Sequence, residues 1–229
     1  MDISLRLKSI ASMVDRCDVC VDIGTDHGYI PIYLIDNHIC NRVIATDINK
    51  EPLNRAKENV TKRRYSDKVD FRLGSGLNTI DKNEADVAII AGMGGNLIKE
   101  IIGENIEKFK SFKYLIVQPV QNVDVLRKYI YSKGFDIIEE KICIEDDKFY
   151  EIIKIKYNSV IIEEEDIFYE VSKYLYERKD EKLKKFIEYK IKTYEKVYSK
   201  IECNTAKSTE RKKQLEKKII KLKELIKWV

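Results

Sequence analysis

Acidic side chains beside glycine-rich turns are the residues of this sequence whose types and spacing could carry chemistry. Val19-Cys20-Val21-Asp22-Ile23 is an apolar, largely β-branched run with an acid near its end, and Gly24-Thr25-Asp26-His27-Gly28 follows it directly. Such a run predicts a buried strand. A strand, a glycine turn and a helix in succession build the crevice at the carboxyl end of an open α/β sheet, where nucleotide cofactors bind.

The spacing of these glycines distinguishes two classes of cofactor. From Asp22 to Gly28 the pattern is Asp-x-Gly-x-x-x-Gly, and the dinucleotide pattern Gly-x-Gly-x-x-Gly is absent there. We therefore expect S-adenosylmethionine in preference to NAD. Asp22 can accept hydrogen bonds from the cationic amine of that cofactor, and backbone N–H groups of Gly24, Thr25 and Gly28 can face its carboxylate.

A second acid stands at the end of the next apolar run. Arg42-Val-Ile-Ala-Thr-Asp47 predicts a strand that ends 25 residues after Asp22. In doubly wound nucleotide sites, an acid in this place accepts hydrogen bonds from the ribose hydroxyls. We therefore place Asp47 and its neighbour Ile48 in the same cofactor site.

Two further glycine turns follow later strands. Gly74-Ser75-Gly76 comes after Val69-Asp-Phe-Arg-Leu73 and can contact the adenine edge of a cofactor, although it can also be a simple tight turn. Ala91-Gly92-Met93-Gly94-Gly95 follows the apolar segment Ala85–Ile90. Three glycines in four positions indicate a backbone pressed against a ligand or a neighbouring loop, so we add Ala91, Gly92 and Met93 to the site.

The elements that must position these residues alternate between strand and helix patterns. This alternation predicts an α/β fold: a Rossmann-like sheet with helices on both faces. Besides the strands above, we expect strands over residues 114–117, 135–144 and 150–157. The expected helices cover residues 4–14, 30–35, 50–62, 97–106 and 123–132, the last capped by Asn122.

The pattern changes after Asn158. Apolar residues spaced three or four apart predict one long helix over 167–201, and the polar stretch 204–209 interrupts it, with Thr209 as the cap of a second helix. Two apolar stripes joined by a short loop describe an antiparallel helical hairpin, or coiled coil. We therefore expect two domains, residues 1–158 and residues 159–229.

Charge is distributed unevenly between these parts. Residues 179–229 carry 17 Lys and Arg against 8 Asp and Glu, a net charge of +9, whereas the other 178 residues carry about −5. A basic tail predicts a polyanionic partner, and the alternative is a solvated helical surface that only keeps the protein soluble.

Composition sets limits on location and on metal chemistry. No apolar run reaches the length of a membrane span, and Asp2, Arg6 and Lys8 interrupt the first helix, so we expect neither a membrane segment nor a signal peptide. Five cysteines, an odd number, favour a reducing compartment, and we expect a cytoplasmic monomer. Cys17-Asp-Val-Cys20 has no second pair to complete a zinc site, so no metal is expected.

Six short motifs occur along the whole chain in an order that resembles one known family, the bacterial tRNA (adenine(22)-N1)-methyltransferases. The motifs are Ser4-Leu-Arg-Leu7, Asp22-Ile-Gly-Thr-Asp-His27 with Tyr29 and Pro31, Gly74-Ser-Gly-Leu77, Ile90-Ala-Gly-Met-Gly-Gly95, Gln118-Pro119 and Tyr150-Glu151. Ala-Gly-Met-Gly-Gly is distinctive, because most N-methyltransferases have Asn/Asp-Pro-Pro-aromatic there. Ser75 and Val120 depart from the family pattern, in which an acid and an Asn are common at these places.

The resemblance implies methyl transfer from S-adenosylmethionine to N1 of a tRNA adenine, with S-adenosylhomocysteine as product and a tRNA-binding basic C-terminal domain. Adenine N1 has an in-plane lone pair, so it needs no strong base; proximity and orientation can carry the catalysis. Asp26 and His27 can hold the unstacked base, and Arg6 can anchor a phosphate or the base. His27 can equally be a turn residue and Arg6 a surface residue.

Three other functions stay open. The same fold can methylate another RNA or a small molecule. An NAD oxidoreductase is less favoured, because the glycine spacing differs from the dinucleotide pattern. A non-catalytic RNA-binding protein with a relic cofactor pocket belongs to a different class, and binding of S-adenosylmethionine separates it from the enzymes.

Overall fold

The computed structural model describes residues 2–228. Contacts divide the chain into two compact units, unit 1 (Met1–Glu163) and unit 2 (Glu164–Val229), and each is described by itself.

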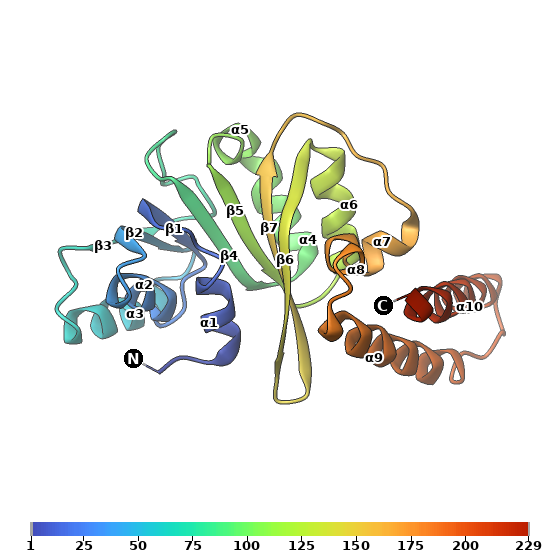
Figure 1. The fold of residues 1–229 in the computed structure, drawn as a ribbon. Helices are drawn as coiled ribbons and strands as arrows, with labels where there is room; N and C mark the ends of the chain where they lie inside the picture. Colours follow the sequence, from blue (N-terminus) through green and yellow to red (C-terminus); the bar gives the residue numbers. More distant parts are fainter. Residues whose placement is uncertain (1, 229) are drawn as a thin grey trace. The chain divides into compact units, whose positions relative to one another are not determined.

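Unit 1 contains a seven-stranded mixed sheet in the order β3-β2-β1-β4-β5-β7-β6 (Figure 1). The first five strands are parallel, and β7 pairs antiparallel with both β5 and β6. The predicted Rossmann-like sheet is thereby confirmed. The strands are β1 (Cys17–Ile23), β2 (Cys40–Asp47), β3 (Val69–Leu73), β4 (Val87–Met93), β5 (Tyr114–Pro119), β6 (Phe135–Glu145) and β7 (Lys148–Tyr157).

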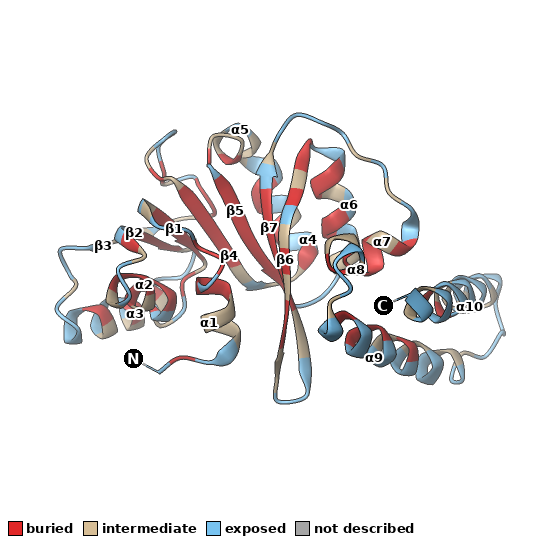
Figure 2. Ribbon diagram, in the orientation of Figure 1, coloured by how far each residue is buried: buried red, intermediate tan, exposed pale blue. Residues whose placement is uncertain are grey.

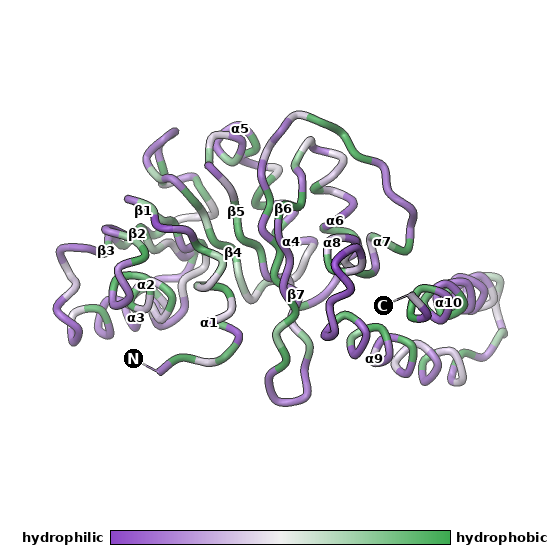
Figure 3. Tube along the Cα trace, viewed as in Figure 1, coloured by the Kyte–Doolittle hydropathy of each residue, from purple (hydrophilic) through white to green (hydrophobic). Residues whose placement is uncertain are grey.

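The core of unit 1 lies on both faces of the central strands. β1, β4 and β5 carry buried apolar side chains at successive positions, as strands covered on both faces do (Figures 2 and 3). Six helices cover the sheet: α1 (Leu5–Ala11), α2 (Tyr29–Asp36), α3 (Lys50–Lys62), α4 (Gly95–Glu104), α5 (Ile106–Phe109) and α6 (Val123–Ser132). Apolar residues of α1, α2 and α3 pack on one face, and α4 packs with α6.

Three local predictions in unit 1 need correction. β4 continues through Ala91 and Gly92 to Met93, because this segment still pairs with β5, with a register irregularity between Ala91 and Met93. The helix expected over 97–106 therefore begins at Gly95, and it ends at Glu104 before the short α5. Asn122 precedes α6, but its side chain forms no capping bond; it supplies a left-handed backbone conformation, φ 54°, which Asn tolerates.

The β6–β7 hairpin reaches past the carboxyl end of β5. β5 pairs with β7 only between Leu115 and Val117, while β6 and β7 stay paired up to Glu145 and Lys148. Asp146 and Asp147 both have positive φ, 49° and 59°, as the two-residue turn of a tight hairpin requires. The tip of the hairpin therefore stands at the carboxyl edge of the sheet.

Unit 2 is helical, but the prediction of one long helix over residues 167–201 was wrong. Residues 167–201 form three helices, because Ser172 and Asp180 accept hydrogen bonds from the N–H groups at the start of new helices. The second long helix is capped by Thr205, and Thr209, the predicted cap, lies inside it. The helices are α7 (Asp166–Glu170), α8 (Lys173–Glu177), α9 (Glu181–Tyr198) and α10 (Ala206–Leu225), followed by a 3₁₀ turn over Ile226–Trp228.

α9 and α10 pack against each other around Ile187, Ile191, Ile219 and Leu222. The buried carboxylate of Glu170 on α7 links them, because it contacts Lys190 and Tyr194 of α9 and Lys218 of α10. Although burial opposes ionisation, the two lysines hold the pKa of Glu170 at about 2. Coiled-coil geometry stays a prediction, and Val229, placed in the apolar stripe, lies outside the described residues.

Candidate cofactor and active site

A hollow of about 530 Å³ opens at the carboxyl ends of β1, β2 and β4, beside the start of α1. It brings together nine of the residues that the sequence predicted for the site: Arg6, Asp22, Gly24, Asp26, His27, Asp47, Ala91, Gly92 and Met93. The sequence reasoning missed four others that line it: Ser4, Leu7, Tyr29 and Ile30.

Strand register explains why two distant acids share this hollow. β1 and β2 pair in parallel with Ile23 opposite Thr46, so Asp22 and Asp47 end at one edge of the sheet. Both N–H groups of Gly24 and Thr25 donate to the Thr46 carbonyl at 2.8 Å. The glycine turn is therefore bonded directly to the end of β2.

Asp22 is a buried acid without a cation. Asp22 is only 4% exposed, and no described residue forms an ion pair with its carboxylate. Burial raises the pKa of Asp22 to about 6, and the negative charge of Asp47 adds to the rise. The Thr25 hydroxyl, which is also buried, acts in the opposite direction and lowers the pKa of Asp22. A ligand with a cationic donor would stabilise the charged form of Asp22.

Two glycines of the turn are required by space as well as by backbone conformation. Gly24 has φ +77°, and a Cβ there would collide with the Met93 side chain that lines the hollow. Gly28 has φ +67° and precedes α2, where a Cβ would lie 3.3 Å from backbone atoms of Ala56 on α3. Gly24 thus keeps the floor of the hollow open, and Gly28 lets α2 and α3 approach closely.

Arg6 is a cation held in a fixed place. Its Nη1 donates to Oε1 of the fully buried Gln118 at 2.7 Å, and its guanidinium lies 5.6 Å from the centre of the Tyr150 ring. At the tip of the hairpin, Glu145 accepts from the backbone N–H groups of Leu5 and Arg6 at 2.5 and 3.3 Å. No described carboxylate pairs with the guanidinium, so its charge remains available to an anion.

Asp26 and His27 lie at the mouth of the hollow. The Asp26 carboxylate is 3.3 Å from Arg55 of α3 and 3.5 Å from Nε2 of His27. His27 has a left-handed backbone, φ 60°, and its carbonyl accepts from Asn59 at 3.0 Å. His27 is therefore both a constrained turn residue and a wall of the hollow, where its ring stacks on that of Tyr29.

The remaining predicted residues do not line the hollow: Thr25, Gly28, Ile48, Gly74, Ser75 and Gly76. Ile48 is 68% exposed, and Gly74 donates from its N–H to the Asp47 carbonyl at 2.9 Å. The loop that begins at Gly74 thus starts beside the second acid of the site.

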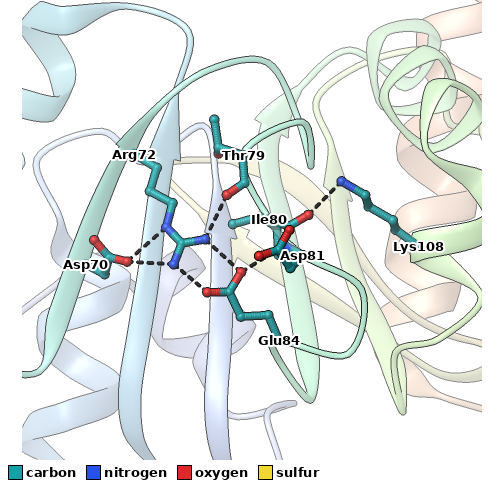
Figure 4. Close-up of polar contacts among 7 residues, drawn as sticks. All are labelled: Asp70, Arg72, Thr79, Ile80, Asp81, Glu84 and Lys108. Carbon is teal, nitrogen blue, oxygen red and sulfur yellow. Dashed lines mark hydrogen bonds and ion pairs between the residues drawn. The ribbon is translucent and has the colours of Figure 1, made fainter.

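A polar network that the sequence did not predict fixes this loop (Figure 4). Arg72 on β3 donates to the Thr79 carbonyl and to both Glu84 carboxylate oxygens at 2.5–2.7 Å. From the other side, Lys108 on α5 donates to the carbonyls of Leu77 and Ile80 at 2.9 and 2.6 Å (Figure 4 draws the second of these bonds). The hydrogen bonds that Arg72 donates to Glu84 lower the pKa of the Glu84 carboxyl to about 2. Residues 74–84 are therefore clamped between β3 and α5.

Residues 2–228 contain neither a cluster of metal-ligating side chains nor a membrane-spanning helix. No three or more His, Cys, Asp and Glu side chains of this region lie together as ligands for a metal ion. Each of its helices is too short or too polar to span a bilayer.

Comparison with known proteins gives one consistent family. The methyltransferase domain model matches residues 3–153. The tRNA (adenine(22)-N(1))-methyltransferase of Bacillus subtilis is 37% identical over 153 residues, which are 67% of this chain and 64% of that enzyme. The matched segment therefore spans less than two thirds of the length of this relative.

Solved structures extend the similarity over nearly the whole chain. The crystal structure of the B. subtilis m1A22 tRNA methyltransferase TrmK superimposes with a TM-score of 0.87 and 29% identity, covering 98% of this chain and 99% of that one. M. capricolum TrmK, in complex with S-adenosylhomocysteine, gives 0.84 and 28%, covering 99% of both chains. A Streptococcus pneumoniae protein in complex with S-adenosyl-L-methionine gives 0.87 and 28%, covering 98% and 100%. The chain belongs to the methyltransferase-domain family.

Proposed function

We propose that this protein transfers the methyl group of S-adenosylmethionine to N1 of adenine 22 in tRNA. The observation that supports this proposal most is the hollow itself, in which no described residue pairs as a cation with the buried Asp22 carboxylate or as an anion with the fixed Arg6 guanidinium. The likeness to M. capricolum TrmK, solved in complex with S-adenosylhomocysteine, supports the same assignment.

The residues of the hollow fit this cofactor. Asp22 would hold the ammonium group, since a cation there removes the penalty of a buried, unpaired carboxylate. Asp47, at the end of β2, would accept from the ribose hydroxyls, and the clamped loop from Gly74 would meet the adenine. When bound, S-adenosylmethionine supplies an electrophilic methyl group on its sulfonium sulfur.

The residues of this chain then act mainly by positioning. Adenine N1 attacks with a lone pair that lies in the plane of the ring, so no proton has to leave first. Proximity and in-line orientation can contribute roughly 7–11 kcal/mol in favourable cases. Unstacking the target base costs a few kcal/mol. Asp26, which lies 3.5 Å from His27, would hold the base through its amino group, and its carboxylate would stabilise the positive charge that develops on the ring.

Residues 159–229 would form the tRNA-binding domain. Several basic residues of α10 are exposed and form no described bond within unit 2, among them Arg211, Lys213, Lys217 and Lys221. Lys213, Lys217 and Lys221 are spaced four apart and therefore share one face of the helix. Phosphate groups of a folded RNA are the partner that such a face suits.

The test is methylation of unmodified tRNA by the pure protein with labelled S-adenosylmethionine, with the modified position mapped by reverse-transcription stops. We expect N1-methyladenosine at position 22, and none in a tRNA that carries guanine there. Cofactor binding without transfer to tRNA would point to another methyl acceptor. No cofactor binding at all would favour the non-catalytic alternative.

A further inference from the structure

Two aromatic rings line the hollow among the residues that the structure describes, those of His27 and Tyr29. Their centroids are 5.2 Å apart and their planes differ by 10°, so the rings are stacked. Tyr29 is 37% exposed, which leaves part of its ring open to the hollow and to solvent. This stacked pair is explained neither by the cofactor contacts above nor by the core of unit 1.

Backbone constraints hold the pair in place before any ligand arrives. His27 is fixed in a left-handed conformation, and its carbonyl is bonded to Asn59 of α3. Tyr29 is the first residue of α2, directly after Gly28, whose close packing on Ala56 fixes the start of the helix. A preorganised surface loses little freedom when a ligand stacks on it.

We propose that the Tyr29 ring, backed by His27, is the surface on which the target adenine stacks during methyl transfer. This inference rests on the proposed function. Stacking fixes the plane of a base and leaves its edge free, so the N1 lone pair can point at the methyl group. The segment Ala91–Asn96, next to the site, contains no aromatic residue that could supply such a surface.

The position of the pair favours the target base over the adenine of the cofactor. Asp47 ends β2, and the loop from Gly74 follows β3. Both strands lie on the same side of β1 in the sheet. Tyr29 begins α2, which contacts α1, the helix that carries Arg6. The cofactor's adenosine part is expected on the β2–β3 side, and the stacked rings stand on the α1–α2 side of the same hollow.

The test compares Tyr29→Leu with Tyr29→Phe, which keeps the ring and is the matched control. Loss of one base–aromatic stack corresponds to roughly a 5- to 150-fold effect. We expect Tyr29→Leu to lower kcat/KM for tRNA within that range, with the affinity for S-adenosylmethionine, measured by calorimetry, within about twofold of wild type. Tyr29→Phe should stay close to wild type. Melting temperatures of both variants show that the fold is retained.

A spectroscopic signature separates stacking from a general structural role. tRNA with 2-aminopurine at the target position is bound in the presence of S-adenosylhomocysteine, so that no turnover occurs. Stacking on a ring quenches this base, so the Tyr29→Leu complex should fluoresce more strongly than the wild-type and Tyr29→Phe complexes. Equal fluorescence in all three, or equal losses of cofactor and tRNA function in Tyr29→Leu, would overturn the inference. Absence of tRNA methylation by the wild-type protein would instead overturn the proposed function.

Discussion

Replacing Asp22 by Asn removes a buried negative charge and keeps the size of the side chain. In the ligand-free protein, burial raises the pKa of Asp22 from 3.8 to about 6. Each unit of pKa difference corresponds to about 1.4 kcal/mol, so the ionised carboxylate destabilises the fold by about 3 kcal/mol at neutral pH. Asp22→Asn should therefore raise the melting temperature of the ligand-free protein at pH 7.5, by up to about 6–12 °C.

The stability penalty of the ionised Asp22 carboxylate should depend on pH. Between pH 4 and 6 the folded protein keeps a proton on Asp22 that the unfolded chain has released, so the contribution of Asp22 to stability falls as pH rises through this window. Above about pH 6 the whole penalty is present. The gap between Asp22→Asn and wild type should grow from pH 4 to pH 6.5 and then stay constant.

Thermal unfolding of both proteins between pH 4 and 8, with and without S-adenosylmethionine, checks this prediction. With the cofactor's ammonium group paired to the ionised acid, as proposed, wild-type affinity should weaken below pH 6, and Asp22→Asn should bind poorly at every pH. Asp47→Asn is the control, since its carboxylate lies in the same hollow but is only partly buried. A variant Asp22→Asn that is less stable than wild type by the same amount at all pH values would refute the reasoning.

The other predictions concern the residue that holds the target base, the 74–84 loop, the anion bound by Arg6 and the basic face of α10. Asp26→Ala should lower kcat more than tenfold with little change in cofactor affinity, measured by calorimetry; equal losses would make it a cofactor residue. Arg72→Gln should release the 74–84 loop and raise the Kd for S-adenosylmethionine about tenfold, while kcat at saturation stays near wild type. Arg6→Gln should lower activity at least tenfold, and comparing Kd for cofactor with KM for tRNA shows which anion it holds. Charge reversal on α10 should flatten the salt dependence of tRNA binding by a slope of about 2–3 if each lysine meets one phosphate; the lysines are Lys213, Lys217 and Lys221.

Elements with strong local signals could be predicted almost to the residue. The helix 50–62 starts near a proline that suits a first turn, and the helix 123–132 ends two residues before Gly134, whose φ is +75°. The helix over 167–201 failed for a different reason. Its apolar spacing continues across Ser172 and Asp180, so periodicity hid two capping residues that end one helix and begin the next.

The site shows the same division between local and distant information. Asp22 and Asp47 could be predicted, because each ends a strand that is recognisable by itself and parallel strands bring their carboxyl ends together. The partners of Arg6 could not. Gln118 lies 112 residues further along the chain, and no spacing rule connects the two. Arg127 is a similar case: a helical arginine that is buried against Glu140 and Glu151 of the β6–β7 hairpin.

The two charges of the hollow are handled by the fold in opposite ways. Arg6 has its guanidinium oriented by an uncharged amide and an aromatic ring, so it is fixed without being neutralised. Asp22 is buried, and no described residue pairs with it as a cation, so its charge costs stability in the ligand-free protein. A cationic ligand group recovers that cost, which adds to the binding free energy, and an anionic group meets Arg6 without having to displace a carboxylate. A hollow whose acid and guanidinium are not neutralised by any described residue therefore suits ligands that carry both charges, and the amino-acid end of S-adenosylmethionine is one such group.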